Sequence, residues 1–359
     1  MQNSRRDGFS GLGGAKRGYL QVARRRKRHP ALQFFRIFLV VAALVLLPET
    51  VLGFSMDLPV DCSEAQTCVV QNYFDHDPSN NYADYICGAL SYNGHQGTDI
   101  RVSYTDMRRG IPVQAVADGT VRAVRASEPE GEISLRGLAS IKGREAGNGV
   151  VLVHAEGYET QYSHLLKGSV AVYPGQRVRA GQRLGLVGLS GATEFPHLEI
   201  SVRQQGQAVD PFTGEGAAGC GGMAQPLWSR PALNSPVLRY RASGLLEAGF
   251  FCEPPKNSIA LLRRHGWIEG QVADLSVLVF GVQVFGPKEG DVWSLRLTGP
   301  DSRILAESRT IQQRNQAQAM RYIGKNKEAV WMSGLYRGEF SLTRAGEHVL
   351  SAVREIQIR

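Results

Sequence analysis

The chain has 359 residues, of which 43% are hydrophobic and 21% charged, a composition typical of a globular protein long enough for two domains. The formal net charge of +8 is local, because residues 1–36 carry ten Lys or Arg against the single acid Asp7, and subtracting this +9 leaves about −1 for the rest. The body of the protein therefore lacks the basic excess expected of a nucleic-acid-binding domain.

The N-terminal segment has the layout of an export signal. A basic run at 24–28 precedes an apolar run at 37–47. The apolar run is shorter than the roughly 20 residues that span a bilayer, so we expect a signal peptide cleaved near Phe54. A retained signal-anchor and a nucleic-acid-binding arm are the alternatives. Residues 1–53 thus predict a protein exported to the periplasm or cell envelope, which contacts the inner membrane only if this segment is uncleaved.

All five cysteines lie beyond this segment, so export would place them where disulfides persist. Cys62 and Cys68 are close enough in sequence to pair within a lead-in segment, residues 54–89. Cys87 with Cys220, or Cys220 with Cys252, would form a second bridge, and the spacing does not choose between them. No Cys-x-x-Cys spacing occurs, which argues against a cysteine zinc site.

The stretch Asn93-Gly94-His95-Gln96-Gly97-Thr98-Asp99-Ile100 offers an imidazole and a carboxylate around a glycine. Zinc takes nitrogen and oxygen donors of this kind, and a catalytic zinc needs three protein ligands and one open position. The pair alone is also compatible with an Asx-type turn and a surface histidine.

From residue 112 to residue 210, short β-branched or alternating runs are separated by turn dipeptides such as Asp118-Gly119 and Pro174-Gly175. These runs predict strands and an all-β, antiparallel domain; they are 113–117, 121–124, 150–154 and 184–187. Residues 126–147 are richer in Gly, Glu and Ser and predict an inserted loop over one end of the sheet.

Two of the later runs contain histidines. Strand alternation predicts that Thr160, Tyr162 and His164 share one face. The same period places His197 and Glu199 together, with Leu198 and Ile200 towards the core. An imidazole beside a carboxylate on a sheet face predicts that the two bind each other or an ion, or that the face is solvated.

The order of these motifs resembles the lysostaphin-type (LytM-type) zinc endopeptidases of peptidoglycan. The resemblance covers roughly residues 90–212 and rests on His-x-Gly-x-Asp, Pro-x-x-Ala-x-x-Asp-Gly-x-Val, Gly-Asn-x-Val-x-x-x-His, Tyr-x-His-Leu, Pro-Gly-Gln-x-Val-x-x-Gly-Gln-x-Leu-Gly, Pro-His-Leu and Val-Asp-Pro. They stand at 95–99, 112–121, 147–154, 162–165, 174–185, 196–198 and 209–211.

The resemblance implies a peptidase domain of duplicated-hybrid-motif fold over residues 90–215. It implies that His95 and Asp99 are zinc ligands and that His164 and His197 are catalytic histidines. The family's third ligand is the second histidine of His-x-His, and this chain has Glu199 there. Carboxylate oxygen binds zinc at about the same distance as imidazole nitrogen, so Glu199 is expected to complete the metal site. His154 matches no ligand and is expected to be structural.

The resemblance further implies a zinc-dependent endopeptidase that cleaves peptide cross-links or stems of peptidoglycan. The substitution at Glu199 supports an alternative, a degenerate domain that binds peptidoglycan or activates other cell-wall hydrolases. In either case peptidoglycan is the expected partner.

The second half lacks a catalytic constellation. Residues 216–270 are rich in Gly and Pro and predict a linker or wrapping arm. Alternation returns at 275–285, 293–297 and 339–342, which predicts a small immunoglobulin-like β-sandwich over residues 271–359. Trp293 and Trp331 are expected in its core.

Overall fold

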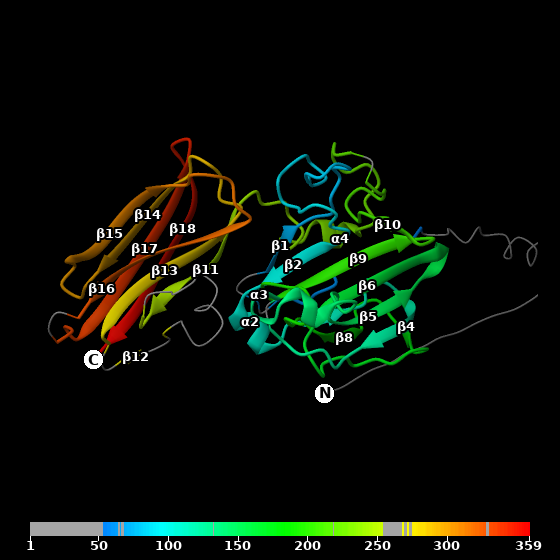
Figure 1. Cartoon of the computed structure of the whole chain (residues 1–359), viewed down its shortest axis with the longest axis horizontal. Coiled ribbons are helices and arrows are strands. Elements are labelled where there is room, and N and C mark those ends of the chain that lie inside the picture. The colour runs from blue at the N-terminus through cyan, green and yellow to red at the C-terminus, as the bar shows by residue number, and fades with distance from the viewer. Residues whose placement is uncertain are drawn as a thin grey trace, which may run out of the picture. The chain divides into compact units, whose positions relative to one another are not determined.

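The computed structural model (Figure 1) describes residues 53–63, 65, 68–131, 133–217, 219–253, 268, 271–272, 275–327 and 330–359. The described residues belong to one compact unit. The predicted signal peptide or anchor lies outside the described residues. Among the residues that are described, no helix has the length and apolar character needed to cross a membrane.

An antiparallel sheet of eight strands dominates the first half of the described chain. Its order is β1-β2-β9-β6-β5-β4-β7, with β10 paired to β9. The strands are β1 (Cys68–Asn72), β2 (Thr98–Val102), β4 (Gly119–Arg125), β5 (Asn148–Val153), β6 (Tyr158–Leu165), β7 (Arg177–Val178), β9 (His197–Gln204) and β10 (Gln207–Val209); β3 (Pro112–Gln114) and β8 (Arg183–Leu186) form a separate pair. The antiparallel all-β prediction is confirmed.

Alternation along β9 separates the core from a polar face. Leu198 and Ile200 have no exposed surface and belong to the apolar core, where Val150 and Leu152 of β5 also lie. Successive side chains of a strand point to opposite faces, so His197 and Glu199 are presented on the other side of the sheet. This part of the sequence-based prediction is confirmed.

The segment 126–147 is folded rather than extended. It contains α3 (Ile133–Arg136) and the 3-10 turn η1 (Leu138–Ile141). Asn148, fully buried, ties this segment to the sheet: its side chain accepts from the Glu128 backbone N–H at 2.7 Å and donates to the Leu165 carbonyl at 3.1 Å. The insert is therefore anchored beside the end of β6. The remaining short helices are α2 (Tyr104–Arg109), η2 (Ala155–Gly157) and α4 (Arg230–Leu233).

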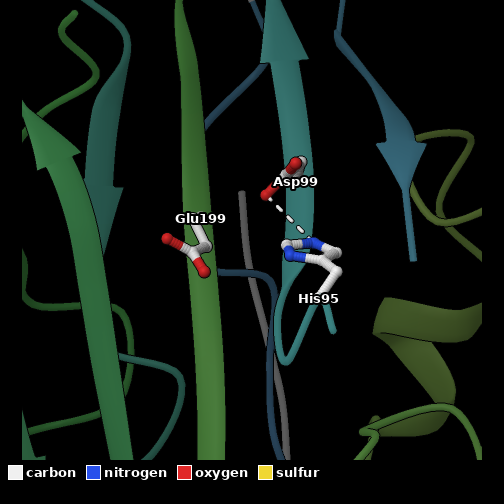
Figure 2. Close-up of side chains that lie close together, drawn as sticks. All are labelled: His95, Asp99 and Glu199. Carbon is white, nitrogen blue, oxygen red and sulfur yellow. Dashed lines mark ion pairs between the residues drawn. The ribbon is translucent and has the colours of Figure 1, made fainter. Parts of the chain in front are cut away.

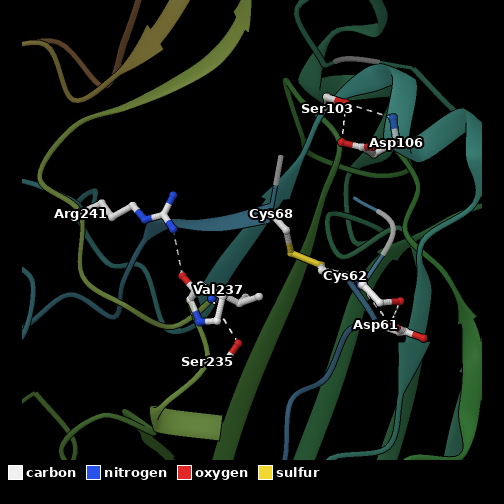
Figure 3. The surroundings of a disulfide bond; sticks show 10 residues. Asp61, Cys62, Cys68, Ser103, Asp106, Ser235, Val237 and Arg241 are labelled. Atoms are coloured by element: carbon white, nitrogen blue, oxygen red, sulfur yellow. Dashed lines mark hydrogen bonds between the residues drawn. A yellow bond between two sulfur atoms is a disulfide. The ribbon is translucent and has the colours of Figure 1, made fainter. Parts of the chain in front are cut away.

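One disulfide lies within the lead-in segment, and a second joins this segment to Cys220. Cys62 is bonded to Cys68 at the start of β1 (Figure 3). Cys87 is bonded to Cys220, and Cys252 is free and exposed. Of the two alternatives left open by the spacing, the structure therefore has the Cys87–Cys220 bridge. β1 lies within the predicted lead-in and pairs with β2, so the lead-in supplies a strand to the main sheet.

The second half contains two further sheets. One has the order β11-β13-β16, and the other has the order β12-β18-β17-β14-β15. Their strands are β11 (Gly244–Phe251), β12 (Gln271–Val272), β13 (Val277–Phe285), β14 (Val292–Thr298), β15 (Ile304–Ile311), β16 (Gln318–Asn326), β17 (Gly334–Arg344) and β18 (Glu347–Ile358).

Side chains from both of these sheets share one apolar core. It contains Phe280 and Ile323 from the smaller sheet and Trp293, Phe340 and Leu342 from the larger one. A two-sheet sandwich is therefore present. The segment expected as a linker or wrapping arm contributes β11, which pairs with β13 because its apolar residues complete this core.

Candidate active site

Three side chains that can bind a metal meet on the polar face of the large sheet (Figure 2). His95 lies just before β2, Asp99 within β2 and Glu199 within β9, and one donor atom of each lies within 4.8 Å of the others. Asp99 and Glu199 are directly opposite each other in the antiparallel ladder between β2 and β9. The sheet register therefore brings together two residues that are 100 positions apart in sequence.

Two atoms of this cluster lack the partners that buried polar atoms normally have. His95 Nε2 and Asp99 Oδ1 are buried without a hydrogen bond and lie 3.3 Å apart. The other Asp99 oxygen, Oδ2, accepts a 2.8 Å hydrogen bond from the Asn72 side chain. Leaving buried polar atoms unpaired is costly, and a cation shared by the three side chains would satisfy both atoms. The donor set, one imidazole and two carboxylates, fits zinc.

The glycine of His-x-Gly-x-Asp makes room for Glu199. A Cβ at Gly97 would lie 2.9 Å from both Cγ and Oε1 of Glu199. That separation is too short for real carbon contacts, so a side chain at residue 97 would displace the carboxylate. The motif thus supplies two donors and also the space for the third.

Two histidines flank this cluster, His164 on β6 and His197 on β9, with ring centroids 4.6 Å apart. Nδ1 of His164 is 2.7 Å from the Ser190 carbonyl oxygen, and Nδ1 of His197 is 2.9 Å from the Phe195 carbonyl oxygen. A carbonyl only accepts, so each Nδ1 carries the proton, which leaves Nε2 as the basic atom of the neutral ring.

Each Nε2 faces the acidic cluster. His164 Nε2 is 3.2 Å from Glu199 Oε2, and His197 Nε2 is 3.6 Å from Asp99 Oδ1. The structure therefore brings together all five residues that the sequence singled out for this site.

His164 lies on the other face of β6 from the one that the sequence predicted. The hydroxyls of Thr160 and Tyr162 bond each other on the core side, whereas His164 lines the polar face. The prediction that the three share one face is wrong, because His164 has a left-handed backbone with φ of 63°. This conformation interrupts strand alternation and turns the imidazole to the opposite side.

Distant backbone groups support this strained conformation. The His164 N–H donates to the Ala146 carbonyl at 2.9 Å, and its own carbonyl accepts from the Gly188 N–H at 3.1 Å. Left-handed backbone costs of order 1–3 kcal/mol for a residue other than glycine and persists where surrounding contacts over-determine it.

Burial and mutual attraction set the protonation of these groups. Burial lowers the pKa of His197 to about 4, which outweighs the opposing effect of the Asp99 carboxylate. At His95 burial also lowers the pKa, but the carboxylates of Asp99, Glu199 and Asp75 together outweigh it and the pKa is raised. Burial raises the pKa of Asp99, yet the charges of His95 and His197 hold it below its usual range. Asp99 is thus kept ionised, as a metal ligand must be.

The cluster opens into a pocket of ≈ 340 Å³. Glu145 and Ala146, at the end of the insert, line one part of it. Gln161, Ser201 and Arg203 extend the lining along β6 and β9 with hydrogen-bonding groups. The pocket thus exposes His95 and Glu199 of the cluster and the base His164 beside a polar floor.

Two contributors were not foreseen. Asn72 lies opposite Asp99 in the β1–β2 ladder, and Tyr92 stacks on His95 with centroids 4.2 Å apart. Neither belongs to a motif, so only the pairing of β1 with β2 could have pointed to Asn72. His154 lies outside the cluster and bonds to Thr160 Oγ1 and the Asp118 carbonyl, as expected of a structural residue.

Comparison with known proteins agrees with this geometry. Residues 93–211 match the family described as Peptidase family M23. An "Uncharacterized metalloprotease" of Haemophilus influenzae is 36% identical over 119 residues, which are 33% of this chain and 20% of that protein. The "DD-carboxypeptidase/endopeptidase Mpg" of Neisseria meningitidis serogroup B is 36% identical over 107 residues, 29% of this chain and 20% of that protein.

A third relative has a different kind of name. The "Murein hydrolase activator EnvC" of Escherichia coli (strain K12) is 37% identical over 102 residues, 28% of this chain and 20% of that protein. The chain thus spans about a fifth of the length of each of these three relatives.

Proposed function

We propose that this chain, whose residues 93–211 form a domain of peptidase family M23, is a zinc-dependent endopeptidase that cleaves peptide cross-links or stems of peptidoglycan. The observation that carries the proposal is that His95 Nε2 and Asp99 Oδ1 are buried beside Glu199 without a hydrogen bond. Two bases, His164 and His197, face the same point.

His95, Asp99 and Glu199 would hold the zinc, which leaves the fourth position open to water or substrate. Bound zinc supplies Lewis acidity, which polarises a carbonyl and makes water a stronger acid. Asn72 donates to Asp99 Oδ2, so Oδ1 is the oxygen of Asp99 that would be left to bind the zinc.

The two histidines would perform the proton transfers. Their Nδ1–H groups are committed to backbone carbonyls, so Nε2 of each ring accepts a proton from water or returns it to the leaving amine. The one ring that takes the proton would then donate a hydrogen bond to the oxyanion that develops on the scissile carbonyl. The carbonyls of Ser190 and Phe195 keep both rings in the productive orientation.

Glu199 distinguishes this site from the family pattern. Two carboxylates and one imidazole carry one more negative charge than one carboxylate and two imidazoles. The additional charge lowers the Lewis acidity of a bound zinc, so a slower reaction is expected. Glu199 also contacts His164 directly, at 3.2 Å, and so links a metal ligand to a base.

The substrate would be an extended peptide lying along the polar floor of the pocket. Gln161, Ser201 and Arg203 offer hydrogen bonds to its backbone and carboxylate groups. Peptidoglycan as substrate and partner is supported by the name of the murein hydrolase activator, and the enzyme would act in the cell envelope after export.

A second candidate function is activation of another cell-wall hydrolase by a catalytically inactive domain. It is favoured by the substitution at Glu199 and by the likeness to the murein hydrolase activator. In that case His164 and His197 would have no proton to transfer, and peptidoglycan or another hydrolase would be the binding partner.

Metal analysis of the purified protein tests the site. We expect one zinc per chain in the wild type and loss of zinc in Glu199→Ala, with Glu145→Ala as a matched control that keeps its zinc. Unchanged zinc content in Glu199→Ala would exclude Glu199 as a ligand.

Release of soluble fragments from purified peptidoglycan then separates the two functions. Hydrolysis that requires His164 supports the endopeptidase. Zinc binding without hydrolysis, together with hydrolysis by Glu199→His, would show that Glu199 silences the site and would favour the activator.

A further inference from the structure

Arg101 is a buried cation beside the site that the proposed mechanism does not use. It lies on β2, two residues beyond Asp99, and is 3% exposed. Its Nη1 donates to the side-chain oxygens of Gln71 at 2.8 Å and Gln318 at 2.7 Å, and its Nη2 lies 3.5 Å from that of Gln283. Burying a guanidinium is costly, and burial lowers the pKa of Arg101 to about 10. A residue kept at this cost is expected to have a specific task.

The guanidinium also contacts the ring of Phe195, two residues before His197 in the chain. Arg101 Cζ lies 4.3 Å from the centroid of the Phe195 ring, within the range of a cation–π interaction. The Phe195 ring lies 4.8 Å from the His197 ring, and the Phe195 carbonyl accepts a hydrogen bond from the His197 Nδ1–H group. Arg101 and His197 are also direct partners across β2 and β9. Arg101 therefore contacts Phe195, and the Phe195 carbonyl in turn orients the His197 imidazole.

Two of the three amide partners come from the C-terminal sandwich. Gln283 lies on β13 and Gln318 on β16, and the Gln283 amide donates to the Gln318 oxygen at 3.1 Å. The amide oxygens orient the guanidinium, and the Glu247 carboxylate raises the pKa of Arg101 against the effect of burial, so Arg101 keeps its charge for the aromatic ring. A lysine would lose both the planar stack and the fork of donors.

We propose that Arg101 is a positioning residue through which the C-terminal sandwich orients His197. Gln283 and Gln318 fix the guanidinium, the guanidinium fixes the Phe195 ring, and Phe195 fixes the Nδ1–H tautomer and the direction of Nε2. The proposal rests on the proposed function, in which His197 Nε2 transfers a proton.

Nuclear magnetic resonance of the metal-free full chain, ¹⁵N-labelled at histidine, tests the coupling without any need for activity. The His197 signals would be assigned by their loss in His197→Asn. We expect the Nδ1–H tautomer in the wild type and a mixture of tautomers in Arg101→Lys and Gln318→Ala. Arg108→Lys, at an exposed arginine, and Gln313→Ala, at an exposed glutamine, are matched controls that keep the wild-type signals.

Kinetics on peptidoglycan fragments give the second readout. We expect kcat to fall about tenfold in Gln318→Ala with KM within twofold, a part of the roughly 10²–10⁴-fold that a positioned acid–base group supplies. Gln318 is only half-buried, so this variant stays folded even if Arg101→Lys does not.

Unchanged His197 signals in a folded Gln318→Ala protein would overturn the positioning role. Absence of hydrolysis by the wild type would instead overturn the proposed function, and the tautomer measurement would still decide the role of Arg101.

Discussion

Two polar sheet faces of this molecule look alike in sequence but differ in what surrounds them. On the large sheet of the first half, His95, Asp99 and His197 are buried, and two of their polar atoms have no hydrogen bond. On the five-stranded sheet of the C-terminal sandwich, Arg337 pairs with Glu339 and Glu355, and all three side chains are more than a third exposed.

The difference lies in hydration. Water satisfies the charges of the sandwich face, so these pairs contribute little to stability and need no ligand. The groups on the large sheet are shielded from water by the insert, by Tyr92 and by their neighbours. Two of their buried polar atoms therefore have no hydrogen bond, and a cation would satisfy them. Alternating polar residues therefore indicate a site only where the fold removes the water.

Removal of a base from the large sheet should give the largest difference in activity between variants of the two faces. We expect His164→Ala to lower kcat on peptidoglycan by about 10²–10⁴-fold, because its Nε2 is one of two proton acceptors beside the metal cluster. Zinc content should stay at the wild-type level. The control is Glu339→Ala on the sandwich face, with kcat within twofold of the wild type. Equal activity of both variants would mean that the large sheet has no catalytic role.

Removal of a supporting hydrogen bond tests whether burial prepares the ligands. We expect Asn72→Ala to weaken zinc binding about 10–100-fold, the usual effect of losing a partner of a metal ligand, because Asp99 Oδ2 would lose its donor. Competition with a calibrated chelator measures the affinity. An affinity equal to that of the wild type would show that Asp99 needs no such support.

Space for the third ligand is the next feature to test. Gly97→Ala places a Cβ 2.9 Å from Glu199, and we expect about tenfold weaker zinc binding, in the range seen when ligand orientation is disturbed. Gly221→Ala is the matched control, because a Cβ there meets nothing within 4 Å. The same chelator competition applies to both. Identical affinities for the two variants would contradict the packing role of Gly97.

The smallest effect is expected on the hydrated face. Arg337→Ala removes two exposed pairs, so the melting temperature should change by less than about 2 °C and hydrolysis should be unaffected. Thermal unfolding followed by circular dichroism measures the shift. A large loss of stability would mean that the exposed face contributes more than hydrated charge pairs normally do.

Local patterns predicted much of this molecule. Alternation in β9 placed Leu198 and Ile200 in the core and His197 and Glu199 on the polar face, because the period of a strand depends only on its own backbone. The ordered motifs between residues 95 and 211 predicted a likeness to zinc endopeptidases, and residues 93–211 match the model of Peptidase family M23. The arrangement of turns and strands likewise predicted an all-β chain.

The failures share a physical cause, which is dependence on distant backbone. Alternation misplaced His164 because its left-handed conformation is held by Ala146 and Gly188, which lie elsewhere in the chain. Asn72 could not be found, because its role depends on the pairing of β1 with β2. β11 was missed because its apolar residues acquire a partner only when β13 lies beside it.

The sequence by itself determined which donors are available, His95, Asp99 and Glu199, and the strand period that points the last of them at the others. Only the tertiary structure decided that His95 and Asp99 are buried, each with an atom that has no hydrogen bond, that His164 turns towards them, and that Cys220 pairs with Cys87. Desolvation, backbone strain and disulfide choice depend on contacts between distant segments, and a local sequence pattern does not specify those contacts.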